Sequence, residues 1–148
     1  AMAALIVPLS LLLPQGAAGG EQQAEAGVLN AEPWSAARLA ALRASGRPVF
    51  VYFTADWCVS CKVNEASSIE REETATAFRN AGVRVLRGDW TSADPAITRE
   101  LATHGRNSVP LYLWYPADGG AQSGGPEILP QILTPAMLVS RASAEAVD

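Results

Sequence analysis

One short segment constrains the fold of this chain more than any other part of its sequence. Residues 49–54 form a run of β-branched and aromatic side chains, and a polar turn follows them. The segment ends in Cys58-Val59-Ser60-Cys61, which holds the only two cysteines of the chain. Residues three apart on a helix lie on the same face, so the two sulfurs can close a small disulfide ring. The spacing therefore predicts a redox-active dithiol.

The strand before the pair places Cys58 at the N-terminus of the helix that follows. Unpaired backbone N–H groups and the helix dipole stabilise a thiolate there, which lowers the pKa of the thiol below the free value of about 8.5. We therefore expect Cys58 to be the exposed nucleophile that attacks a substrate disulfide. Cys61, one helical turn deeper, would resolve the mixed disulfide.

Two other interpretations of the cysteines remain open. A tetrahedral zinc ion needs four ligands, and beyond the pair the chain has one histidine, His104, which we expect on the surface at a helix end. The pair could instead be a purely structural disulfide, although so short a ring removes little conformational entropy from the unfolded chain.

The length and charge of the chain restrict its number of domains and the kinds of partner it could bind. The chain has 148 residues, 49% of them hydrophobic, which suits one compact domain with a tail. The formal net charge is −4, and the Lys and Arg residues are scattered, so no basic patch indicates nucleic-acid binding. Two cysteines alone do not fix the cellular compartment, because this spacing also occurs in the cytosol.

The N-terminus carries an apolar run over residues 3–13 that gives way to a stretch rich in Gly, Gln and Glu. The run is shorter than the ~18 apolar residues that span a bilayer, and no basic region precedes it as in a signal peptide. We expect residues 1–27 to be the end of a transmembrane segment and its linker, or a disordered tail. Residues 28–148 would form the domain.

The rest of the chain alternates strand and helix patterns, which predicts an α/β fold with a mixed central sheet flanked by helices. Proline, glycine and capping residues set the boundaries. We expect strands over 49–54, 83–89, 111–115 and 127–129, and helices over 36–44, 58–67, 71–81, 95–104 and 135–146. Val63 and Ala66 are expected among the buried positions of the helix that begins at the cysteines.

The motif Ala55-Asp56-Trp57-Cys58-Val59-Ser60-Cys61-Lys62, together with Val109-Pro110, resembles the thioredoxin fold. With Glu65 added, it most resembles the C-terminal periplasmic domain of transmembrane thiol:disulfide interchange proteins of the DsbD/ScsB type. The resemblance extends from about Trp34 to the C-terminus. It implies a cis bond between Val109 and Pro110, and a Val109 backbone that pairs with a substrate strand.

Trp57 and Glu65 also lie near the cysteines in the sequence. Trp57 would offer substrates an apolar docking surface, or would only pack on its own domain. In the family a buried acid six positions before the first cysteine accepts a proton, but Tyr52 stands there in this chain. Glu65 is the remaining candidate acceptor for the Cys61 proton, since it follows Cys61 by one helical turn.

The resemblance implies a protein-disulfide reductase that needs no cofactor and no metal. It would take electrons from a membrane-embedded redox domain and pass them to a periplasmic thiol–disulfide protein. The domain would be tethered at the periplasmic face of the inner membrane. Two alternatives stay open: a free-standing thioredoxin-like oxidase or isomerase, and a non-enzymatic binding module with a structural disulfide.

Overall fold

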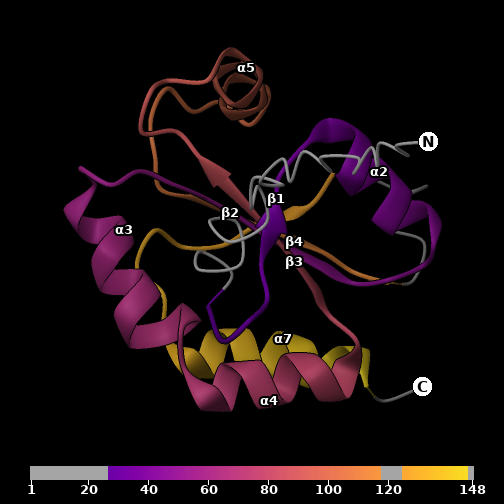
Figure 1. Ribbon diagram of the computed structural model, residues 1–148. Helices are drawn as coiled ribbons and strands as arrows, with labels where there is room; N and C mark the ends of the chain where they lie inside the picture. The colour runs from indigo at the N-terminus through magenta and orange to yellow at the C-terminus, as the bar shows by residue number, and fades with distance from the viewer. Residues whose placement is uncertain (1–26, 118–124, 147–148) are drawn as a thin grey trace, which may run out of the picture.

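The computed structural model describes residues 27–117 and 125–146, and its centre is a mixed five-stranded sheet (Figure 1). Along the sheet the strand order is β1-β3-β2-β4-β5. The bounds are β1 Glu32–Pro33, β2 Val49–Thr54, β3 Arg84–Asp89, β4 Leu111–Tyr115 and β5 Glu127–Ile128. β2 runs parallel to β3 and antiparallel to β4. The predicted α/β class with a mixed sheet is confirmed.

Strand β2 is buried along its whole length because both faces of the sheet are covered. On one face its side chains, Phe53 among them, pack with buried residues of α2 (Ala36–Ala44) and α5 (Pro95–Thr103). On the other face Phe50 and Tyr52 pack with α4 (Glu72–Ala81) and α7 (Pro135–Glu145), which lie side by side in Figure 1. A strand that is buried on both faces has apolar side chains without alternation, and the sequence of β2 shows this pattern.

The predicted boundaries of α2, α4, α5 and α7 hold to within one residue because capping residues occupy them. The Ser35 and Thr134 side chains accept hydrogen bonds from backbone N–H groups in the first turns of α2 and α7. Asp94 caps α5 in the same way, directly before its first residue, Pro95. Gly82 follows α4 in the left-handed conformation, with φ 68°, that favours glycine.

The helix after the cysteines differs from the prediction. It is an α-helix only over α3 (Val59–Asn64), and then widens into a π-helical turn, η1 (Glu65–Ile69). The expectation that Val63 and Ala66 are buried is wrong, since both are exposed. The buried residues are instead Cys61, Asn64, Ser68 and Ile69. The inward face therefore carries polar side chains, which an apolar pattern could not identify.

Strand β1 was not predicted, because two residues carry no periodicity. It pairs with β3 in parallel, and the Glu32 carboxylate forms ion pairs with Arg38 and Arg84. The hydrogen bond from Arg38 is the main cause of the lowered pKa of Glu32.

Residues 1–27 were expected to be the end of a membrane segment and its linker, or a disordered tail. Of these, residues 1–26 lie outside the described residues. Within the described ranges, no helix is long and apolar enough to cross a bilayer.

Candidate active site

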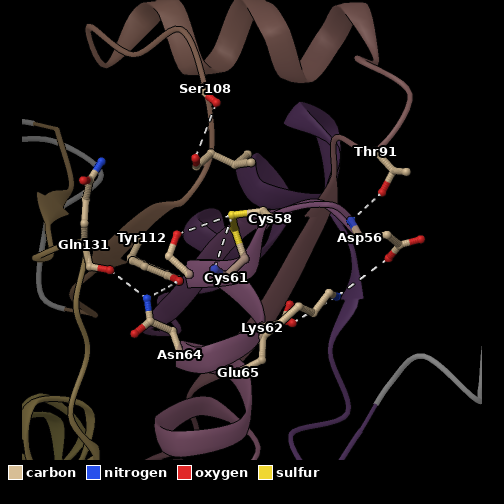
Figure 2. The surroundings of a disulfide bond; sticks show 12 residues. Asp56, Cys58, Cys61, Lys62, Asn64, Glu65, Thr91, Ser108, Tyr112 and Gln131 are labelled. Atoms are coloured by element: carbon tan, nitrogen blue, oxygen red, sulfur yellow. Dashed lines mark hydrogen bonds and ion pairs between the residues drawn. A yellow bond between two sulfur atoms is a disulfide. The ribbon is translucent and has the colours of Figure 1, made fainter.

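The two cysteines form a disulfide where β2 gives way to α3, with their Cα atoms 5.3 Å apart (Figure 2). Cys58 is the N-cap of α3, and its sulfur accepts a hydrogen bond from the backbone N–H of Cys61 at 3.3 Å. This confirms the expected place of Cys58 at the start of the helix. Cys58 is 7% exposed and Cys61 only 1%, so Cys58 is the more accessible of the two residues although both are buried.

The turn before the disulfide is held by the loop that follows β3. The backbone N–H of Asp56 donates to the Thr91 hydroxyl at 3.0 Å, and the Trp57 indole N–H donates to the Thr91 carbonyl at 3.2 Å. The backbone N–H of Cys58 donates to the Ala55 carbonyl at 3.1 Å. β2 and β3 are parallel, so their carboxyl ends bring these two loops together.

Trp57 keeps 56% of its surface exposed, although one edge of its indole is bonded to Thr91. Its ring centroid lies 6.0 Å from that of Trp90. Val59, in the first turn of α3, is also exposed, at 77%. Apolar surface is therefore available to a partner beside Cys58, while Trp57 packs partly on its own domain.

The peptide bond between Val109 and Pro110 is cis, as the resemblance implied. Val109 is buried in the same core cluster as both cysteines, directly before strand β4. Its carbonyl accepts a hydrogen bond from the Ser108 hydroxyl at 3.4 Å (Figure 2). The structure thus brings this segment, distant in sequence, into the same buried cluster as the disulfide.

Glu65 follows the cysteines at the junction of α3 and η1, and its side chain is only 14% exposed. One carboxylate oxygen lies 3.1 Å from the Lys62 ammonium, and the other is buried without a hydrogen-bond partner among the described residues. Lys62 also lies 3.7 Å from Asp56, whose side chain is 71% exposed. Lys62 therefore pairs with one carboxylate that precedes the disulfide in sequence and one that follows it (Figure 2).

Tyr52 occupies the place where the family has a buried acid. It is 2% exposed, and burial, followed by the negative charge of Glu70, raises the pKa of its phenol well above the ordinary value. A phenol that keeps its proton at neutral pH cannot accept one. Tyr52 therefore does not replace the acid.

Three residues that organise this site carry no recognisable signal in the sequence. Thr91 binds the turn before the disulfide. Asn64 and Tyr112 are buried and joined by a hydrogen bond of 2.8 Å between α3 and β4. No pattern marks an isolated Asn in a helix or a Tyr in an apolar strand as polar partners, because their pairing depends on the tertiary fold.

His104 was expected on the surface at a helix end. It does lie at the C-terminal end of α5, but its side chain is only 11% exposed and its ring nitrogen lies 3.0 Å from the Glu100 carboxylate.

Comparison with known proteins agrees with this geometry. A thioredoxin-like family profile matches residues 30–117. The thiol:disulfide interchange protein DsbD of a Pseudomonas species is 44% identical over 80 residues, covering 52% of this chain and 13% of that protein. DsbD 2 of Pseudomonas aeruginosa is 44% identical over 64 residues, covering 43% of this chain and 10% of that protein. The matched segments are thus a small part of these relatives' own length.

Solved structures show the same fold. The oxidised C-terminal domain of DsbD from Neisseria meningitidis aligns with a TM-score of 0.56 at 22% identity, over 78% of this chain and 98% of that domain. A thioredoxin from Thermus thermophilus aligns with a TM-score of 0.57 at 15% identity, over 79% of this chain and 88% of the other. The predicted thioredoxin fold is confirmed.

Proposed function

This chain belongs to the thioredoxin-like family, and from that premise we propose that it is a thiol–disulfide exchange domain that reduces protein disulfides through Cys58 and Cys61. The observation that carries the proposal is the disulfide itself, which lies at the start of α3 with the more exposed cysteine, Cys58, at the helix N-cap. A thiolate at that position accepts hydrogen bonds from backbone N–H groups, which favours the charged form.

The reaction uses two exchanges. In the reduced domain the Cys58 thiolate attacks one sulfur of a substrate disulfide, and the other substrate sulfur leaves as a thiolate. Cys61 then loses its proton and attacks the Cys58 sulfur of the mixed disulfide. The bond between Cys58 and the substrate breaks, the substrate leaves as a second thiolate, and the Cys58–Cys61 disulfide forms. Two electrons pass from the domain to the substrate, and the two substrate thiolates take up protons.

The segment before β4 and the indole beside the disulfide would hold the substrate. We assign backbone pairing with an extended substrate segment to Val109, with Pro110 fixing the direction of that segment. Val109 shares a buried cluster with the cysteines, which supports the assignment. Trp57 would cover the apolar part of the substrate, as its 56% exposure allows.

The relatives are thiol:disulfide interchange proteins by name, which supports an exchange role for this chain. We propose that it stands at the periplasmic face of the inner membrane. It would be re-reduced there by a membrane-embedded redox domain and would pass electrons to a periplasmic thiol–disulfide protein. The matched segments reach at most 18% of the relatives' length, so the membrane-embedded donor would lie in sequence outside the matched region.

A redox titration tests the proposed function. The domain is equilibrated in glutathione buffers of graded composition, and free thiols are alkylated and counted by mass. We expect a two-electron transition with a midpoint between about −270 and −200 mV, the range of thioredoxin and the glutaredoxins, since the domain is to act as a reductant. A midpoint near about −120 mV would indicate an oxidase instead. A disulfide that stays closed throughout would indicate a binding module with a structural bridge.

Glu65 is proposed as the group that takes the Cys61 proton during the second exchange. It lies one helical turn after Cys61, and one of its carboxylate oxygens is buried and unpartnered among the described residues. Replacing Glu65 by Gln removes a negative charge that opposes thiolate formation. We therefore expect Glu65→Gln to lower the midpoint pH of Cys58 alkylation and to slow release of the mixed disulfide near neutral pH.

Asp56→Asn is the matched control for Glu65→Gln. Asp56 also pairs with Lys62, but its side chain is 71% exposed, so solvent screens its charge. Removing that charge should change neither the pH dependence of Cys58 alkylation nor the release rate appreciably. Alkylation against pH and the single-turnover release rate are measured for both variants and the wild type. Superimposable curves for Glu65→Gln and wild type would show that Glu65 takes no part and that water or another group accepts the proton.

A further inference from the structure

Asn64 is a buried amide whose hydrogen bonds join the C-terminal end of α3 to two other segments, β4 and the segment before α7. Its NH₂ group donates to the Tyr112 hydroxyl at 2.8 Å and to the Gln131 carbonyl at 2.7 Å. Its carbonyl oxygen accepts from the backbone N–H of Leu133 at 3.0 Å. The residue is 3% exposed. In Figure 2 its side chain points toward Tyr112 and Gln131, away from Lys62 and Glu65.

Such a residue is costly to bury unless its hydrogen bonds are made, and an apolar side chain would fill the same space at a lower desolvation cost. Three bonds to two other segments fix the position of Asn64, and therefore of the helical turn that carries it. That turn begins with Cys61. Tyr112 lies two residues after Pro110, so the amide links the turn of the second cysteine to the strand that begins at the proposed substrate-binding segment.

The two cysteines have different anchors. The turn before Cys58 is bonded to Thr91, on the loop after β3. The turn that starts at Cys61 is bonded through Asn64 to β4 and to the segment before α7. In the oxidised domain the disulfide also joins the two sulfurs. In the reduced domain and in the mixed disulfide that link is absent, and the backbone of α3 together with these anchors keeps Cys61 within reach of Cys58.

We propose that Asn64 is a positioning residue for the second exchange: it holds Cys61 where its thiolate can attack the Cys58 sulfur of the mixed disulfide. This inference rests on the proposed function and extends it to a residue that touches neither sulfur. Fixing two reacting groups in place raises their effective concentration, so loosening one of them slows the intramolecular step. The first exchange, which needs only Cys58 and the substrate, is spared.

The same reasoning applies to the redox equilibrium. Closing the Cys58–Cys61 disulfide from a loosened dithiol is less favourable than closing it from a positioned one. Loss of the Asn64 bonds should therefore favour the dithiol form. A tenfold change in the equilibrium constant corresponds to about 30 mV for this two-electron couple.

Asn64→Leu is the main test variant, because leucine is similar in size and cannot make the three bonds. The reduced proteins are mixed with the chromogenic disulfide dithiobis-nitrobenzoate in a stopped-flow instrument. The first thionitrobenzoate released reports attack by Cys58, and the second reports resolution by Cys61. We expect Asn64→Leu to slow the second release about tenfold and to change the first less than about twofold. Its equilibrium with glutathione should shift about tenfold toward the dithiol.

Two further variants separate positioning from stability. Tyr112→Phe removes only the link to β4, and should slow the second release by a smaller factor while leaving the first unchanged. Ser68→Ala is the matched control: the Ser68 hydroxyl, one turn beyond Asn64, donates to the Leu133 carbonyl at 2.9 Å. It is equally buried, so its loss should lower stability but alter neither release rate nor the glutathione equilibrium.

Three results would overturn the proposal. Equal slowing of both releases in Asn64→Leu would mean that the amide supports the fold alone, and an unchanged second release would mean that Cys61 does not depend on it. If Asn64→Leu does not fold, an unchanged second release in Tyr112→Phe decides against the proposal. Absence of the first release in the wild type would instead refute the proposed function, and this inference with it.

Discussion

Replacing Cys61 by Ser should leave the domain covalently joined to its substrate through Cys58. The thiolate of Cys58 can still attack a substrate disulfide, because its place at the N-cap of α3 does not depend on the second sulfur. Serine cannot complete the exchange, since its hydroxyl forms no disulfide. The mixed disulfide therefore accumulates, and turnover falls to the background rate of uncatalysed exchange. Mass spectrometry of the intact adduct, then of its peptides, identifies the linked residue.

Cys58→Ser is the control for this experiment. Cys61 is 1% exposed and sits behind Cys58, so it should react with protein disulfides only at the background rate and should trap no partner. Adducts that form in Cys58→Ser but not in Cys61→Ser would reverse the assignment of nucleophile and resolving thiol. Captured with a periplasmic extract, the Cys61→Ser adduct would also identify the electron acceptor.

Phe50→Ala should be the most destabilising of the single substitutions considered for the fold. The Phe50 ring lies at the centre of an aromatic cluster, with centroids of Tyr52, Phe78, Trp114 and Tyr112 between 5.8 and 6.4 Å away. Truncation removes these contacts and leaves a cavity, at a cost of about 3–5 kcal/mol. Domains of this size are stable by only about 5–15 kcal/mol. Urea unfolding of the oxidised domain, followed by tryptophan fluorescence, measures the loss.

Two variants calibrate that loss. Phe50→Leu keeps most of the volume and should cost less than about 1.5 kcal/mol. Ile132→Ala, at a side chain 78% exposed, should change the free energy of unfolding by less than about 0.5 kcal/mol. If Phe50→Ala lowers the free energy of unfolding no more than Ile132→Ala does, the cluster relaxes around the missing ring. The Phe50 ring would then contribute little to the stability of the core.

The parts of the fold that the sequence predicts well are those encoded by local chemistry. β2 could be placed from its unbroken apolar run, and α5 and α7 from a capping residue directly before proline. The cysteine pair identified the place of the site, because its spacing has few chemical uses. These signals are strong because one residue, or one short run, determines each of them.

The parts that the sequence does not predict depend on partners far along the chain. Asn64 lies 67 residues from Gln131 and 48 from Tyr112, so its burial follows from tertiary contacts and not from helical periodicity. The same contacts explain why Val63 faces solvent while a polar residue faces inward. A π-helical turn such as η1 has no sequence signature, and a two-residue strand such as β1 is fixed only by the strand it joins.

The short outer strands of the sheet limit what the molecule can join at its edges. β1 and β5 are two residues each; Pro33 in β1 has no N–H group to donate, and Pro126 and Pro130 flank β5. A long, unpaired edge strand is a template on which another polypeptide can add a strand and aggregate. Within the described residues, the two edges of this sheet therefore offer little such template. An extended polypeptide would find few unpaired backbone groups at either edge, which limits aggregation through strand addition.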